Sequence, residues 1–251
     1  MVYTTAVFQP NLSAAHRAAR CIFAANNANT NWARVMFTDS KYFQLHPPKK
    51  GRAMRSWTPA GQRRVLPAIR NSQQVHVYAG VTQFGVTKLL FVTGTTGQAS
   101  PFTNPRNNTK YSGVCQQEYQ QIIAPHLIAE GHRLFANTAY RDNWVFQQDG
   151  ARVHTAISSV QYIQASVGGG VLRNWPANSP DLSWIENIWA WAEGELRRRP
   201  LCSNVEELKR VLNEIWEDLE QNHAHILRNC VVSMPRRMRR VTEHGGGHIG
   251  N

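Results

Sequence analysis

The sequence predicts an α/β domain in which helices cover a mixed β-sheet. Short runs of strand-forming residues alternate with longer segments whose apolar residues recur at helical spacing. In chain order these segments are three strands after a first helix, then a helix, a strand, a helix, a strand and two helices, an order typical of α/β domains. The chain has 251 residues, of which 42% are hydrophobic and 10% aromatic, and this is ample material for one core.

The first third of the chain contains the first helix and three of the predicted strands. Residues 13–25 are rich in alanine and predict a helix. Residues 32–40 contain a short run of strand formers that ends at Asp39. Residues 75–81 and 88–93 predict two more strands, which a short Gln-Phe-Gly link makes antiparallel neighbours. The second of these is continuously apolar, which suggests burial on both faces.

The middle of the chain begins with a loop and continues into a helix. Residues 94–113 are rich in Gly, Pro, Asn, Thr and Ser, and the segment is too long to be a simple connection, so it is functional or disordered. A helix is predicted over 115–130, bent or interrupted at Pro125 and closed by Gly131.

The last third alternates strands and helices. A strand over 144–149 is followed by a helix over about 155–167, a short strand over 171–174 and a helix over about 184–198. The last predicted helix begins at Ser203, because Ser-x-x-Glu at this point is a capping box. We divide the chain into a helical lead-in, an α/β domain with a loop insertion at about 94–113, and a basic C-terminal tail, over residues 1–30, 31–222 and 223–251.

The distribution of charge points to a polyanionic partner. The net charge is +12 and the pI about 10.1. Residues 1–180 hold 18 Lys and Arg but five acids (18 − 5 = +13), whereas residues 181–251 hold 10 bases and 11 acids (10 − 11 = −1). Nucleic acid is the simplest partner for an acid-poor stretch of this length, and the alternative is a basic protein without a specific partner.

Other classes of protein are disfavoured. The four cysteines lie far apart in the sequence and form no Cys-x-x-Cys pair, so a disulfide scaffold or a zinc site built on them is not expected. No apolar run approaches the roughly 20 residues that a membrane span needs, and we expect no membrane partner.

One segment is the best candidate for contact with DNA. Residues 46–70 carry seven basic residues and no acid, with Pro and Gly throughout, which indicates an exposed loop. Lys and Arg would neutralise phosphates and an aromatic ring could stack on an unpaired base. The alternative is a solvated loop without a partner. The candidate DNA-binding residues are Lys49, Lys50, Arg52, Arg55, Trp57, Arg63 and Arg64.

Three acids are candidates for catalysis. Asp39 and Asp149 each end a predicted strand, and strand ends are where open α/β sheets place their sites. With Glu186 they would supply the oxygen ligands that Mg²⁺ or Mn²⁺ prefers. Each also has a structural alternative: Asp149 precedes Gly and could belong to a turn, and Glu186 could cap a helix through Ser183-x-x-Glu186. Asp181 could equally be the N-cap of that helix.

Three segments together resemble a known family. FTDSKYF, VFQQDGARVHTA and NWPANSPDLSWIENIWAW, in that order, are similar to the catalytic segments of Tc1/mariner-type DDE transposases. Asp149 and Glu186 are separated by 186 − 149 − 1 = 36 residues, close to the short spacing of that family. The C-terminal SMPRRMRRVTEHGGGH also resembles the end of Tc1-like transposases.

The resemblance implies an RNase H-like fold and metal-dependent cleavage and strand transfer of DNA. It implies that Asp39, Asp149 and Glu186 are the catalytic acids and hold two Mg²⁺ or Mn²⁺ ions. His154 matches a family position next to the site, and we favour the interpretation that it orients the turn or caps the following helix. Expected partners are transposon ends and target DNA, with a possible homodimer, and the expected location is the nucleus.

The sequence also departs from the family pattern. Family members carry an N-terminal helix-turn-helix region that reads the transposon ends, and because only 38 residues precede Asp39 we expect that region to be missing. Asp39 is followed by Ser where many relatives have Glu, and the loop over 94–113 differs from the compact form. The alternative is therefore a noncatalytic nucleic-acid-binding relic or a domesticated protein.

Overall fold

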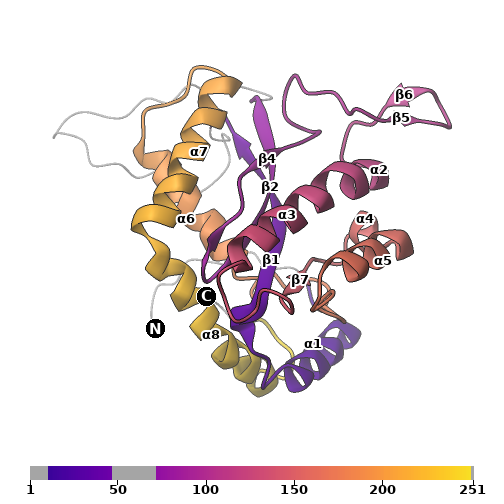
Figure 1. The fold of residues 1–251 in the computed structure, drawn as a ribbon, viewed down its shortest axis with the longest axis vertical. Helices are drawn as coiled ribbons and strands as arrows, with labels where there is room; N and C mark the ends of the chain where they lie inside the picture. Colours follow the sequence, from indigo (N-terminus) through magenta and orange to yellow (C-terminus); the bar gives the residue numbers. More distant parts are fainter. Residues whose placement is uncertain (1–10, 47–71, 250–251) are drawn as a thin grey trace.

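A mixed β-sheet lies at the centre of the molecule (Figure 1). The computed structural model describes residues 11–46 and 72–249. The strands lie in the order β3-β2-β1-β7, and β4 also pairs with β2. Strand β1 is antiparallel to β2 and parallel to β7, so the sheet is mixed as predicted. The strands are β1 (Val35–Gln44), β2 (Gln74–Thr82), β3 (Gly85–Val86), β4 (Leu90–Phe91) and β7 (Val145–Gln147).

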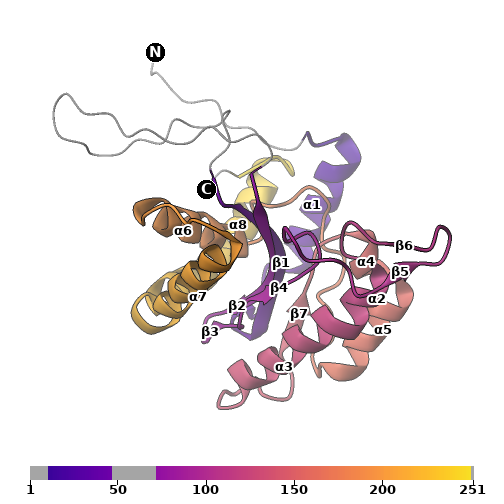
Figure 2. The same ribbon diagram turned by 90° about the horizontal axis from the view of Figure 1, so that it is seen from above.

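Helices cover both faces of the sheet (Figure 2). One face is covered by α6 (Ile185–Arg198), α7 (Val205–Asn222) and α8 (Ala224–Glu243). The other is covered by α2 (Gln116–Glu118), the π-helical turn η2 (Tyr119–Ile123), α3 (Ala124–Phe135), α4 (Arg152–Thr155) and α5 (Ile157–Ser166). Each layer encloses its own cluster of buried apolar side chains. No helix in these described ranges is long and apolar enough to cross a membrane.

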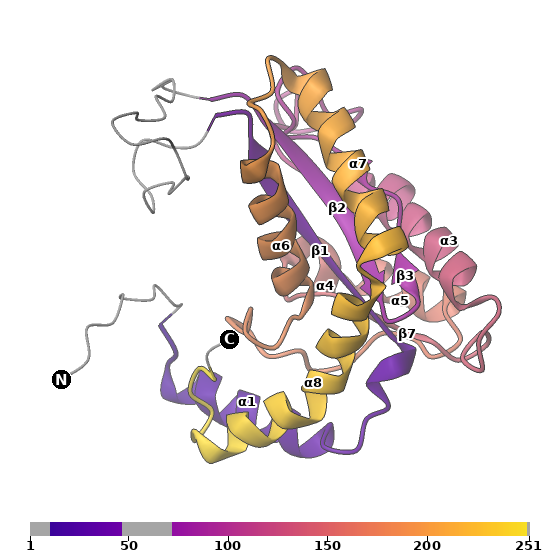
Figure 3. The ribbon, with the colours of Figure 1, turned by 90° about the vertical axis from the view of Figure 1, so that its left-hand side faces the viewer.

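The first and last helices lie side by side (Figure 3). Helix α1 (Ala14–Asn26) begins at Ser13, which caps the backbone N–H of His16, and a short 3-10 turn (Trp32–Arg34) leads from it into β1. The segment over 223–251, expected as a tail, is largely the helix α8, and Leu227, Met234 and Val241 of that helix belong to the core.

Two predicted strand limits were wrong. Strand β1 does not end at Asp39 but continues to Gln44, because β2 offers a partner along its whole length, from Phe37 opposite Val81 to Gln44 opposite Gln74. The strand predicted over 88–93 is only the half-buried pair of β4. The strand predicted over 171–174 is reduced to a single bridge between Phe146 and Val171.

The predicted helix limits also needed correction. Gly131 does not end a helix, since α3 continues to Phe135 and a Cβ at Gly131 would lie 2.4 Å from the ring of Trp144. Pro125 lies in the first turn of α3, where it is tolerated, and the π-helical turn precedes it. The helix predicted over 155–167 is divided into α4 and α5. The N-cap of α7 is Asn204, whose side chain accepts from the N–H of Glu207, one residue later than predicted.

The loop insertion over 94–113 contains a small ribbon. Strands β5 (Thr103–Asn104) and β6 (Thr109–Lys110) pair antiparallel around a turn in which Asn108 has a positive φ. The ribbon is separate from the central sheet.

Candidate active site

The three candidate acids line one pocket at the edge of the sheet where β1 and β7 run parallel. The last registered pair of these strands is Phe37 with Gln147, and Asp39 and Asp149 each lie two residues further on. Thr38 Oγ1 donates to the carbonyl of Gln147 over 2.6 Å and holds the two segments together. The pocket, a cavity of about 360 Å³, is lined by Thr38, Asp39, Gln147, Asp149, Gly150, Trp175, Pro176, Ala177, Asn178, Ser179, Pro180, Ser183 and Glu186.

Asp39 carries an unfavourable negative charge in this pocket. Burial raises the pKa of its carboxyl from an ordinary 3.8 to about 7, and the negative charges of Glu186 and Asp149 add to the shift. Hydrogen bonds from the backbone of Ser40 and the side chain of Trp189 oppose it only in part. A neighbouring cation would reverse this shift, because an opposite charge within about 4–6 Å favours the ionised carboxylate.

Asp149 is held by a histidine. Its Oδ1 lies 2.5 Å from Nδ1 of His154 and accepts a hydrogen bond from the N–H of Ala151 over 3.0 Å. Burial alone would raise the pKa of Asp149, but the hydrogen bond and charge of His154 together with the Ala151 N–H lower it below its ordinary value. The carboxylate is therefore kept ionised and its orientation is fixed.

His154 is itself fixed by buried aromatic and amide groups. It lies in α4, with its ring 4.4 Å from that of Tyr119 between centroids. Gln148 Nε2 donates to its carbonyl over 2.8 Å, and the Tyr119 hydroxyl donates to Gln148 Oε1 over 2.6 Å. The predicted capping role was wrong, because α5 begins without a side-chain cap and the His154 ring contacts Asp149 instead.

Glu186 lies in the first turn of α6 and does not form the predicted capping box. Its N–H donates to the backbone carbonyl of Ser183 over 3.1 Å, and α6 has no side-chain cap. Burial raises the pKa of the Glu186 carboxyl; the charge of Lys41 opposes this shift and that of Glu193 adds to it. The side chain is thus available for another role in the pocket.

The donor set suits a divalent cation, although the carboxylates are not arranged around one. Within residues 11–46 and 72–249, no group of three or more His, Cys, Asp or Glu side chains is positioned to hold a metal ion. The three acids nevertheless share one pocket, and their mutual repulsion raises the pKa of Asp39. Hard carboxylate oxygens that repel one another are relieved by Mg²⁺ or Mn²⁺, so the residues fit such ions by their chemistry.

The predicted DNA-binding segment lies outside the described residues. All seven of its candidates fall within 47–71, and they stay a prediction: Lys49, Lys50, Arg52, Arg55, Trp57, Arg63 and Arg64.

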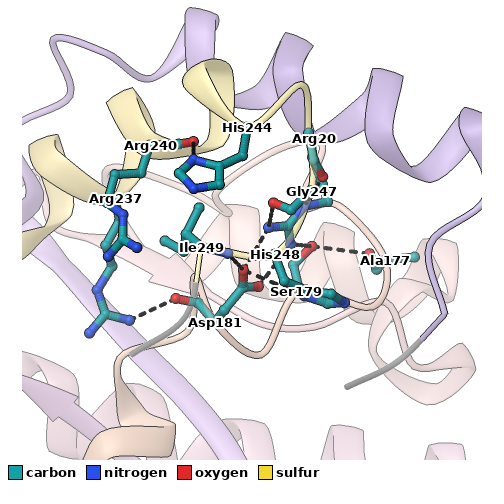
Figure 4. Close-up of polar contacts among 11 residues, drawn as sticks. Arg20, Ala177, Ser179, Asp181, Arg237, Arg240, His244, Gly247, His248 and Ile249 are labelled. Carbon is teal, nitrogen blue, oxygen red and sulfur yellow. Dashed lines mark hydrogen bonds and ion pairs between the residues drawn. The ribbon is translucent and has the colours of Figure 1, made fainter. Parts of the chain in front are cut away.

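Sequence reasoning missed a buried arginine behind the pocket. Arg20 is fully buried and forms an ion pair with Asp181, whose predicted role as a helix N-cap was therefore wrong (Figure 4). The signal available in the sequence was the scarcity of acids next to an arginine in an alanine-rich helix, but nothing in the chain order connects residues so far apart.

Comparison with known proteins gives the same result along most of the chain. Residues 106–209, which include Asp149 and Glu186, match the family of DDE superfamily endonucleases. The chain is 29% identical over 247 residues to the Tc3 transposase of Caenorhabditis elegans, and the match covers 96% of this chain and 65% of that protein. It is 25% identical to the Tc1 transposase of the same organism, over 96% of this chain and 80% of that protein. The chain belongs to the Tc1/mariner group of DDE transposases.

Solved structures of this group share the fold. The crystal structure of the Mos1 mariner paired end complex with Mn matches all of the chain and 68% of that chain, with a TM-score of 0.73 and 16% identity. The catalytic domain of the Mos1 mariner transposase matches 97% of this chain and 100% of that domain, with a TM-score of 0.63 and 14% identity. The predicted RNase H-like mixed sheet flanked by helices is thereby confirmed. The chain spans about two thirds of the length of the Tc3 transposase.

Proposed function

We propose that the chain is the DNA-cleaving and strand-transferring domain of a Tc1/mariner-like transposase. Asp39, Asp149 and Glu186 are its catalytic acids and hold two Mg²⁺ or Mn²⁺ ions. The observation that carries the proposal is the convergence of these acids on one pocket, in which their charges raise the pKa of Asp39 to about 7. A fold that keeps such repulsion without a cationic ligand would gain nothing from it.

The three carboxylates have different tasks in this proposal. The chemistry supplied by two bound ions is activation of water or a 3′-hydroxyl and stabilisation of the leaving oxygen in an in-line displacement. Asp149 is ready as a ligand, because His154 and the Ala151 N–H keep it ionised and hold Oδ1, which directs Oδ2 to the pocket. Asp39 must lose its proton when it binds a cation, so binding is weaker at acidic pH.

DNA is the proposed substrate and partner. The net charge of +13 over residues 1–180 supports phosphate binding, and the Mos1 structures include a pre-cleavage transpososome and a strand transfer complex. Phosphate contacts bind without regard to sequence, so affinity for DNA should fall steeply with salt, with a slope of about −0.9 per phosphate neutralised. The Mos1 paired end complexes also support a dimer as the working form of this chain.

A plasmid-nicking assay tests the proposal. The parent protein should nick supercoiled DNA with Mn²⁺ or Mg²⁺ and not with EDTA. The double variant Asp149→Asn with Glu186→Gln should lose this activity and keep its circular dichroism spectrum. Matched controls are Asp142→Asn, whose side chain is 94% exposed outside the pocket, and Glu195→Gln on the same helix as Glu186. A folded parent that binds DNA but nicks with neither metal would instead be the noncatalytic binding protein.

A further inference from the structure

A buried arginine connects three distant parts of the chain behind the pocket (Figure 4). Arg20 of α1 has no exposed side-chain surface, yet it donates five hydrogen bonds. Its Nη1 and Nη2 grip the two carboxylate oxygens of Asp181 over 2.8 and 2.7 Å, and Nη1 also donates to Ser179 Oγ over 2.7 Å. Its Nε donates to the carbonyl of Gly246 over 2.8 Å and Nη2 to that of Gly247 over 3.1 Å.

The C-terminal turn is built to reach this arginine. Gly246 has a φ of +76°, and a Cβ added there would lie 2.1 Å from the backbone carbonyl oxygen of Arg17. Only glycine fits where the turn packs directly on α1. The turn then returns to Asp181, whose Oδ2 accepts from the N–H of Ile249 over 3.0 Å and lies 3.6 Å from Nδ1 of His248.

The loop that carries Ser179 and Asp181 is the wall of the pocket. Residues 175–180 line the cavity of the three acids, and the loop leads straight into α6, which holds Glu186 in its first turn. That helix begins without a side-chain cap. The position of Glu186 must therefore be fixed by contacts on either side of it rather than by the helix start itself.

Arg237 of α8 makes those contacts. Its Nη1 donates to the backbone carbonyl of Asp181 over 2.8 Å, and its Nη2 donates to Oδ1 of Asn187 over 2.7 Å. One guanidinium thus joins the residue five positions before Glu186 to the residue directly after it. The planar fork of arginine suits this task, whereas lysine offers a single point of attachment.

We propose that Arg20, Asp181 and Arg237 are positioning residues that hold Glu186 and the pocket wall in the arrangement that accepts metal. This inference rests on the proposed function, because it takes Glu186 to be a ligand. A buried ion pair adds little to stability compared with apolar packing of the same volume, so stability alone gives little reason for this network. Groups that support metal ligands, by contrast, change metal affinity about 10–100-fold when they are altered.

The experiment compares Arg20→Lys and Arg237→Lys with Phe135→Leu. The two lysine variants keep the charge and lose the fork. Phe135→Leu opens a cavity in the other hydrophobic cluster, where Phe135 stacks on Trp144, and serves as the matched control for lost stability. Arg237 is only partly buried, so Arg237→Lys provides a folded variant if Arg20→Lys does not fold.

Three measurements are made on each protein: the Mn²⁺ concentration for half-maximal nicking, the rise in Tm caused by Mn²⁺ alone, and metal-free amide exchange. We expect the lysine variants to need about tenfold more Mn²⁺, by both metal readouts. The amides of Glu186 and Asn187, bonded to Ser183 and Trp184, should exchange faster in them. Phe135→Leu should lower Tm and leave the Mn²⁺ requirement and these two amides unchanged.

The outcomes separate this proposal from the proposed function. If the parent nicks DNA with metal and the folded lysine variants keep its Mn²⁺ requirement and exchange rates, the positioning role is overturned and the proposed function stands. If the parent itself neither nicks DNA nor gains Tm with Mn²⁺, the proposed function fails first. Equal losses in the lysine variants and in Phe135→Leu would show a general effect of stability and would also overturn the positioning role.

Discussion

Asp39 and Asp149 line the same pocket two residues beyond the same strand pair, but the pKa of the first is raised to about 7 and that of the second is lowered. Both carboxyls are penalised by burial. The difference lies in their neighbours. Asp149 has His154 at 2.5 Å, whereas the groups that favour ionised Asp39 are hydrogen bonds from Ser40 and Trp189.

This comparison shows how one site can contain both a preformed ligand and a carboxyl that waits for a cation. The internal histidine compensates the charge of Asp149 before metal arrives. Asp39, repelled by Glu186 and Asp149, gains the most from a positive charge entering the pocket. The protein thereby couples its own protonation to the binding of metal.

The largest effect should be an opposite change in metal-free stability. At pH 8 Asp39→Asn should raise the free energy of unfolding by up to a few kcal/mol, because it removes a carboxyl that ionises unfavourably in the folded state. Asp149→Asn should lower it by about 1 kcal/mol, a small amount because 53% of that side chain is exposed. Urea unfolding in EDTA measures both values, and two changes of the same sign would refute the comparison.

The pH dependence checks the cause of that difference. Folded Asp39 keeps its proton up to about pH 7, whereas the unfolded chain releases it near 3.8. Its contribution to stability is therefore full below pH 3.8, is lost as pH rises toward 7 and stays level above that. The curves of the parent and Asp39→Asn should separate over this window, and parallel curves would assign the stabilisation to another cause.

A smaller effect is expected from His154→Gln. Loss of the histidine charge should let the pKa of Asp149 rise toward its ordinary range and release Oδ1. We expect about tenfold weaker Mn²⁺ activation of nicking, as for other groups that orient a metal ligand. His132→Gln, on the far end of α3, is the matched control and should leave activation unchanged. An unaltered Mn²⁺ requirement in His154→Gln would show that Asp149 needs no support.

The smallest effect should come from Glu186→Gln on the neighbouring acid. Removing the Glu186 charge lowers the pKa of Asp39 below 7, since that charge is the second cause of the shift after burial. The carboxyl signal of Asp39 in a carbon NMR titration measures the change directly. A carbon signal that titrates as in the parent would place the two side chains too far apart to share a metal.

The sequence was sufficient to predict the mixed sheet, both covering layers and the three acids. Asp39, Asp149 and Glu186 could be selected because acids are scarce in the first 180 residues and because their flanking segments resemble a family. Asp39 was nevertheless misplaced at a strand end. The length of β1 is set by β2, which lies some 30 residues away along the chain and pairs with β1 from Phe37 to Gln44.

Other features depend on contacts that no local pattern contains. Gly131 read as a helix end, but it lies inside α3 because Trp144 packs against it. Asp181 and the Ser183-x-x-Glu186 pattern matched local capping rules, and a partner from α1 or α8 determines their actual bonding. Propensity and spacing describe neighbours in sequence, whereas these residues obtain their roles from tertiary packing.

The separation of 226 residues between Arg20 and Gly246 has a consequence for the birth of the protein. A ribosome delivers the chain from its N-terminus, and earlier segments begin to fold while later ones are still being made. The sheet and most helices can thus form during synthesis, but the turn that completes the bonding of Arg20 emerges last. A nascent chain that already displays its acids therefore lacks the anchor of the pocket wall, so the fold itself delays cutting of DNA until translation has passed residue 249.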